Sequence, residues 1–121
     1  MTPHTVTRQA AQGDLLVRRI DALPVGLVEV VPAPEGHILA HSETGHHHLV
    51  REPSAVRLLR PADDTGPLAG LVAYLEVLAE HADVVHARSW DTHDTLRLPR
   101  GVWEIRRQRE RAPEGWRRVQ D

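Results

Sequence analysis

The 121-residue sequence contains no cysteine, lysine, asparagine or phenylalanine. The absence of cysteine excludes disulfides, thiolate nucleophiles, iron–sulfur clusters and every zinc site that uses cysteine. Any metal ion in this protein must therefore be held by histidine, aspartate, glutamate and water. Because lysine is absent, all fifteen cationic side chains are arginine. Together with abundant alanine, valine and leucine, this bias is typical of a GC-rich bacterial genome.

Neither sign of charge is in large excess, since the formal net charge is −2 with histidine neutral. This balance disfavours nucleic acid as a partner of the whole molecule. No apolar run is long enough to cross a bilayer, and residues 1–12 lack the apolar segment of a signal peptide. We therefore expect a cytoplasmic protein, and its length suits one compact domain.

Turn-forming residues divide the chain into short segments that are rich in aliphatic residues. We expect residues 1–12, which are polar and unpatterned, to form a disordered arm before a single β domain over 13–121. Strand-like segments follow at 15–20, 25–31, 38–41, 46–51, 56–59, 71–78, 82–88, 95–98, 102–109 and 116–119. Segment 71–78 also fits a helical stripe, but its β-branched residues favour a strand, and 99–101 is expected to be a turn. Eight to ten short strands without a long helix predict an all-β sandwich or barrel.

The run from Ser42 to His48 is the segment best suited to chemistry, because it places three consecutive histidines near a carboxylate. If this part of the chain is a strand, alternation places His46 and His48 on one face and His47 on the other. Two imidazoles in this relation can chelate one metal ion. Glu52 shares their parity and would supply a third donor, so the sequence predicts a metal site.

Further candidate donors lie on both sides of this pair. His41 and Glu43, across the expected hairpin turn, are alternative ligands, and His86 would face inward from its own strand. Two histidines and one carboxylate suit Fe(II), Mn(II) or Ni(II), whereas three histidines and water suit Zn(II). His93 precedes the expected Leu-Pro-Arg-Gly turn and is the candidate catalytic residue, as a ligand or proton-transfer group. The alternative interpretation is a solvated histidine-rich turn that binds no metal specifically.

The spacing of His46, His48 and Glu52 resembles the first motif of the cupin superfamily, in which a His-x-His pair precedes a glutamate. This resemblance implies a double-stranded β-helix barrel with one metal ion inside. The sequence departs from the motif at Ala40, where glycine is expected, and no histidine follows the Pro-Arg-Gly of residues 99–101. The resemblance therefore leaves the fourth ligand unassigned.

The chain is also similar to a family of small uncharacterised bacterial all-β proteins. The similarity begins with the Gly-Asp pair of segment 12–17 and continues with Thr-Gly-His-His-His at 44–48. It then includes His93, the Leu-Pro-Arg-Gly of segment 98–103, and Arg-Gln-Arg-Glu at 107–110. This similarity spans most of the chain. It brings no established activity, so it supports the division into segments more than any function.

Arginine and tryptophan gather near the carboxyl end of the chain. The candidate partner-binding residues are Arg106, Arg107, Arg109, Trp103 and Trp116. Glu104, Glu110 and Glu114 are interspersed among them, and this disfavours an RNA-binding function.

Two functional hypotheses lead. The first is a small metal-binding β-barrel protein, extending to a metalloenzyme that acts on a small molecule. The second is a non-catalytic interaction or assembly module, which docks a protein partner with its edge strands and its arginine- and tryptophan-rich end. The sequence identifies no reaction. Exposed strand edges would also permit a homodimer.

Overall fold

The computed structural model describes residues 3–40, 47–67, 69–86, 95–107, 109–112 and 115–118, the last two ranges through their backbone alone. The strands are β1 (His4–Thr5), β2 (Gln9–Gln12), β3 (Leu15–Ile20), β4 (Leu27–Glu29), β5 (His37–Ala40), β6 (His48–Val50), β7 (Val56–Pro61), β8 (Val72–His86), β9 (Leu96–Arg107), β10 (Arg109–Ala112) and β11 (Gly115–Arg118). In the described residues the only helical element is the 3-10 turn η1 (Pro53–Ala55). The all-β prediction is confirmed. None of the described residues belongs to a helix long and apolar enough to cross a membrane.

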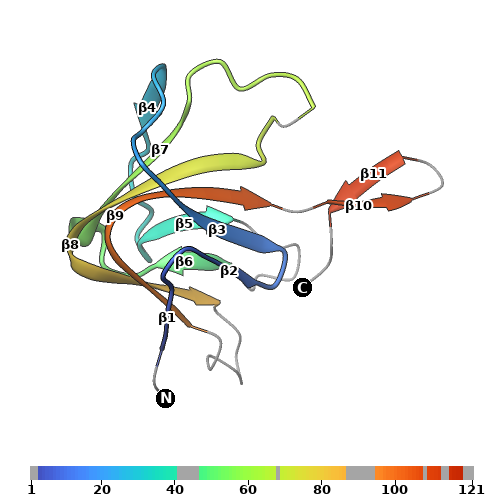
Figure 1. Ribbon diagram of the computed structural model, residues 1–121. Helices are drawn as coiled ribbons and strands as arrows, with labels where there is room; N and C mark the ends of the chain where they lie inside the picture. Colours follow the sequence, from blue (N-terminus) through green and yellow to red (C-terminus); the bar gives the residue numbers. More distant parts are fainter. Residues whose placement is uncertain are drawn as a thin grey trace.

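The long strands β8 and β9 form the central ribbon of the fold (Figure 1). They pair antiparallel along both halves, with a register irregularity between Val77 and His81. Leu75 and Val77 are buried before this point, and Ala82 and Val84 are buried after it, so the inward-facing parity changes there. A bulge that shifts the alternation also bends the strand. Both halves of the ribbon therefore present an apolar face to the same interior.

Further strands extend the ribbon on both of its edges. Strand β7 pairs with the first half of β8, and β6 pairs with its end. On the other edge β3 pairs antiparallel with the second half of β9, and β1 pairs parallel with its start. Strands β2, β4 and β5 complete a nine-stranded sheet whose longest path ends at β2 and β5. In the described part of the chain these two strands do not pair with each other, so the sheet is not closed. The β-helix barrel implied by the cupin resemblance stays a prediction.

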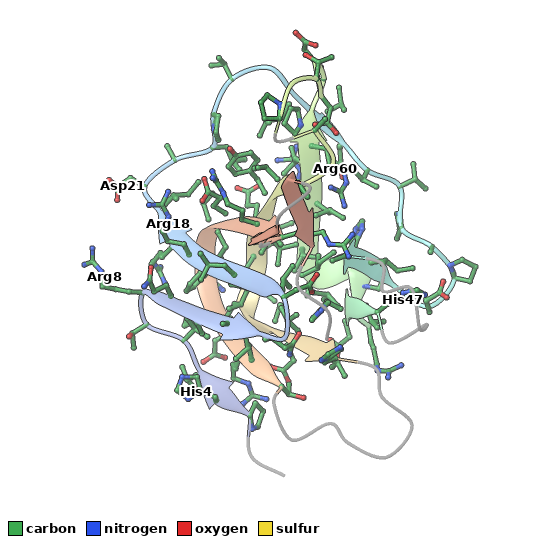
Figure 2. All side chains as sticks on the ribbon, turned by 90° about the vertical axis from the view of Figure 1, so that its right-hand side faces the viewer. His4, Arg8, Arg18, Asp21, His47 and Arg60 are labelled. Carbon is green, nitrogen blue, oxygen red and sulfur yellow. The ribbon has the colours of Figure 1, made fainter. Side chains whose placement is uncertain are left out.

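The hydrophobic core lies inside the bent sheet and draws on both halves of it. Its fully buried members include Val17, Leu58, Leu75, Leu98 and Trp103. Each large side chain of this kind contributes about 1.5–3 kcal/mol on burial. Arg8, Arg18 and Asp21 are charged residues whose side chains lie outside, as Figure 2 shows. The sheet thus encloses one apolar interior.

Two features differ from the sequence predictions. Residues 4–5 and 9–12 form strands β1 and β2, where a disordered arm was expected, and Val6 between them is buried at 1% exposure. The segments predicted on either side of 79–81 form one strand, β8, and those on either side of 99–101 form β9. The residues between these segments bend the strands instead of ending them.

Candidate functional site

Five polar side chains are buried in the described structure, and four of them gather in one place. Gln12 and Asp14 come from the turn between β2 and β3, His48 from the start of β6, and His86 from the end of β8. Burying a polar group costs free energy unless it forms hydrogen bonds. We therefore treat these four residues as the candidate functional site and call them the buried cluster.

The β2–β3 hairpin sets the positions of Gln12 and Asp14. Gln12 pairs with Leu15, which leaves a two-residue loop of Gly13 and Asp14. Gly13 has a φ of 58°. Glycine with a positive φ at the first loop position is the pattern of a type II′ hairpin turn. This tight turn holds the two polar side chains close to each other, and both contact His48.

Strand pairing brings the two histidines together. His48 and His86 are directly opposed in the antiparallel register of β6 and β8. Their rings are stacked, with centroids 4.1 Å apart and planes 17° from parallel. Both side chains are completely buried. Because cross-strand neighbours share one face, the stacking follows from the register.

Both ring nitrogens of His48 have hydrogen-bond partners. Nδ1 lies 2.8 Å from Oε1 of Gln12, and Nε2 lies 3.2 Å from Oδ1 of Asp14. Gln12 also donates from Nε2 to the carbonyl oxygen of Val84, at 3.0 Å. A carbonyl only accepts hydrogen bonds, so this contact fixes which end of the Gln12 amide faces His48. Nδ1 of His48 must therefore carry a proton and donate it to Oε1.

The other side of His48 then has a specific electrostatic requirement. With a proton on Nδ1, a neutral imidazole presents a lone pair at Nε2, and this lone pair faces a carboxylate oxygen of Asp14. Two electron-rich atoms at this distance require a cation between them, either a proton or a metal ion. The Nη2 atom of Arg107 lies 3.6 Å from Oδ2 of Asp14. This guanidinium faces the second oxygen of the Asp14 carboxyl group.

Only some of the predicted metal ligands meet in the structure. His48 and His86 lie together, whereas Glu52 does not join them, because the chain turns into η1 after β6 and leaves Glu52 exposed. His47, labelled in Figure 2, is half-buried and precedes β6. His41, Glu43, His46 and His93 lie outside the described residues. In the part of the chain that is described, no three histidine, aspartate or glutamate side chains form a group that could hold a metal ion.

The predicted partner-binding residues have separate roles. Trp103 is completely buried, and its Nε1 donates to the carbonyl oxygen of Pro99 at 3.1 Å. Inward alternation on β9 places Trp103 in the core, and its role in partner binding stays a prediction. The side chain of Arg106 is 39% exposed and approaches Glu104, whereas that of Arg107 is 14% exposed and lies beside Asp14. Arg109 and Trp116 belong to β10 and β11.

Sequence reasoning missed Gln12 and Asp14. They flank a glycine, and polar residues around glycine are ordinary in exposed turns. The available signal was the Gln-Gly-Asp triplet directly before the apolar strand 15–20, which is the position of a tight hairpin end. That signal locates the turn, but it does not reveal which strand packs against it.

The fold and the buried cluster define a small all-β protein with an open sheet and a stacked pair of interior histidines. The chain belongs to the family described as a domain of unknown function (DUF8820), whose family model matches residues 11–108. This match spans the whole buried cluster and confirms that the family is uncharacterised. No curated protein and no solved structure matches the chain.

Proposed function

We propose that the protein binds one divalent transition-metal ion, of the group Fe(II), Mn(II), Ni(II) and Zn(II), between His48 and Asp14. The observation that carries this proposal is the 3.2 Å approach of Nε2 of His48 to Oδ1 of Asp14, with the Nδ1 proton held by Gln12. An imidazole nitrogen and a carboxylate oxygen are ligands that all four metals accept. Two ligand atoms of one metal ion are commonly separated by such a distance.

The surroundings of this pair support the proposal. Metal-bound histidines usually donate their second N–H to an oxygen, which fixes the tautomer and the orientation of the ring. Gln12 would have this role for His48, and Arg107 would orient Asp14 through its other oxygen. The ring of His86 packs against the His48 imidazole beside the pair. The carboxylate ligand is thus Asp14 in this proposal, in place of Glu52.

The proposal extends to metal-dependent chemistry on a small molecule. The two protein ligands, His48 and Asp14, leave coordination positions for water or a substrate. His46, His41 and Glu43 stay sequence-based candidates for further ligands, and His93 stays the candidate catalytic residue.

The test is thermal unfolding of the untagged full chain after adding each of the four metals, together with its metal content on purification. Tight binding to the folded state should raise the melting temperature by about 5 °C or more in at least one case. Asp14→Asn and His48→Gln should abolish this increase. His81→Gln, at an exposed position of β8, should retain it.

The competing account is a buried imidazolium–carboxylate ion pair bridged by a proton. On that account no metal raises the melting temperature of the wild type, or each metal raises the melting temperatures of the wild type and the three variants equally. Either result would eliminate the metal proposal. The Asn variant keeps the shape of the side chain, so its folding can be checked in the absence of metal.

A further inference from the structure

Strand β4 lies beside β7 at an edge of the main sheet (Figure 1). It pairs antiparallel with β7, and within the described parts of the chain no other strand pairs with it. The N–H of Val30 donates to the carbonyl oxygen of Leu58 on β7, at 2.8 Å. Because alternate residues of a strand direct their backbone groups to the same side, the N–H and C=O groups of Leu27 and Glu29 point away from β7.

Exposed aliphatic side chains gather along this edge, in the seven residues from Val25 to Val31, which we call the valine edge. Four large hydrophobic side chains are exposed among the described residues. Three of them are Val25, at 96%, Val28, at 51%, and Val31, at 85%, and the fourth is Leu78 on β8. A single exposed valine is ordinary on a protein surface. Three within seven residues, beside unpaired backbone groups, indicate an edge that another strand covers.

The valine edge lacks the devices that usually keep an edge strand from pairing, such as proline, lysine and free charges. Its one charged residue is Glu29, whose carboxylate lies 3.1 Å from Nε of Arg57 and is therefore already paired. Pro24 and Pro32 flank the edge on both sides. Because proline has no N–H to donate, strand pairing is confined to the residues between them, about 23 Å of extended chain.

We propose that the valine edge pairs antiparallel with the valine edge of a second copy of this chain, about a two-fold axis through Val28. In this register Leu27 lies opposite Glu29 of the second copy, so the outward N–H and C=O groups of both residues form hydrogen bonds. Val28 lies opposite its own copy as a non-hydrogen-bonded pair, in which the side chains are closest. At each end Val31 of one copy approaches Val25 of the other.

Charge and backbone direction select this register. An axis through Glu29 would also join outward backbone groups, but it would oppose two glutamates directly, and like charges in this relation are destabilising. An axis between two residues would set outward groups against groups that already face β7. The axis through Val28 avoids both conflicts.

The positions of the valines favour a second copy over a strand of a different protein. Val25 and Val31 are each three residues from Val28, so the exposed side chains are symmetric about the proposed axis. Such self-complementarity is what a two-fold interface requires, and it closes the assembly at two copies. An edge of this length is small for a protein interface, so we expect a weak dimer, with a dissociation constant on the order of 10–100 µM.

Sedimentation velocity of the untagged full chain, at about 1–300 µM, tests this inference. A chelator in the buffer removes association through metal-bridged surface histidines. The wild type should convert from monomer to dimer over this range. Val28→Lys should raise the dissociation constant at least about tenfold, because it opposes two ammonium groups at the axis. Leu78→Lys, at a similarly exposed position of β8, is the matched control and should stay within about twofold of the wild type.

A charge exchange at the axis tests the register itself. Val28→Glu should also be monomeric, whereas an equimolar mixture of Val28→Lys and Val28→Glu should associate at least about tenfold more tightly than either variant alone. Only an axis through Val28 opposes this position with itself. The melting temperature of each variant reports on its fold. Val28→Glu lies opposite Arg60 within its own chain, so it keeps the test informative if Val28→Lys is unstable.

Three results would overturn the proposal. A wild type that stays monomeric throughout would leave the edge to a strand of a different protein. Dimers of folded Val28→Lys as tight as those of the wild type would assign the association to another surface. A mixture that associates no more tightly than the single variants would contradict the axis through Val28.

Discussion

Gln12 determines the protonation of the buried cluster, because its amide contacts the carbonyl oxygen of Val84 on one side and Nδ1 of His48 on the other. Gln12→Ala removes both partners at once. Each buried group that loses its hydrogen bond costs about 1–3 kcal/mol. We expect the free energy of unfolding, measured by urea denaturation, to fall by about 2–4 kcal/mol. Gln9→Ala, at an exposed position of the same strand, should cost less than about 0.5 kcal/mol, and equal losses in the two variants would contradict this role.

His37 should make the stability of the protein sensitive to acid. The residue is 3% exposed, and its Nδ1 has no hydrogen-bond partner among the described residues. Burial lowers the pKa of His37 below its ordinary value of 6.5, and the nearby charge of Glu29 offsets this only in part. The unfolded chain therefore binds a proton at a pH at which folded His37 does not. Stability should decrease as the pH falls from about 6.5 toward the lowered pKa of the folded state.

Urea denaturation at about pH 7.5 and about pH 5.5 measures this effect. Between these two values the wild type should lose more free energy of unfolding than His37→Gln, which cannot titrate. The exposed His81 provides the control, because His81→Gln should behave like the wild type. If His37→Gln loses as much stability as the wild type, His37 is not the acid-sensitive group.

Among the elements, the β5–β6 hairpin depends on the absence of a side chain at Gly36. A Cβ at this position would collide with the carbonyl oxygen of Val50, and the φ of Gly36 is +124°. Gly36→Ala should therefore weaken the pairing that holds His48 in β6. Gly26 has a φ of +77°, and a Cβ added there would meet no atom within 4 Å, so Gly26→Ala carries backbone strain alone.

We expect Gly26→Ala to cost about 1–2 kcal/mol of the free energy of unfolding, and Gly36→Ala at least about 2 kcal/mol more. Chemical denaturation of the two variants measures the difference directly. Similar costs would show that the contact with Val50 relaxes without affecting the hairpin.

At the scale of elements, sequence reasoning succeeded where strands are short and bounded by strong breaks. Strand β3 has the predicted bounds of 15–20. The predicted bounds of β8 and β9 were wrong, because a bulge interrupts the alternation of apolar residues in the same way that a loop does. Residues 79–81 have the pattern of a break, yet β8 continues through them with a change of parity. Local periodicity carries no information on whether a neighbouring strand spans the interruption.

In the whole molecule, both halves of the bent sheet share one core, so unfolding should be a single cooperative transition. Leu75 lies in the first half of β8 and Leu98 in the opposite half of the ribbon, and both are completely buried. Leu75→Ala and Leu98→Ala should each cost about 2–5 kcal/mol. Leu78→Ala, at 47% exposure, should cost less than about 1 kcal/mol.

Far-ultraviolet circular dichroism during urea unfolding tests this prediction. Each core variant should shift the whole transition without changing its slope. Two separate transitions in either variant would show that the halves unfold independently, which would contradict the prediction of a single β domain.

The site was predictable only in part, because its residues come from three distant segments. His48 and His86 could be selected by residue type and strand parity. Gln12 and Asp14 could not, since only the pairing of β3 with β9 and of β6 with β8 brings their turn against the histidines. The exposure of Glu52 and the burial of Trp103 depend on neighbours in the fold that no local pattern reveals. Tertiary topology, which the sequence does not encode in short windows, selects the members of the cluster.

The most direct test of the metal proposal is long-range ¹H–¹⁵N NMR of the histidine side chains, with His48 assigned from the His48→Gln spectrum. Zn(II) is a suitable diamagnetic probe, because it binds such ligands at least as tightly as Fe(II) or Mn(II). We predict that Zn(II) shifts Nε2 of His48 into the metal-bound range while Nδ1 keeps its proton. If His48 carries protons on both nitrogens with and without Zn(II), the cation between His48 and Asp14 is a proton, and the proposal of a metal site is wrong.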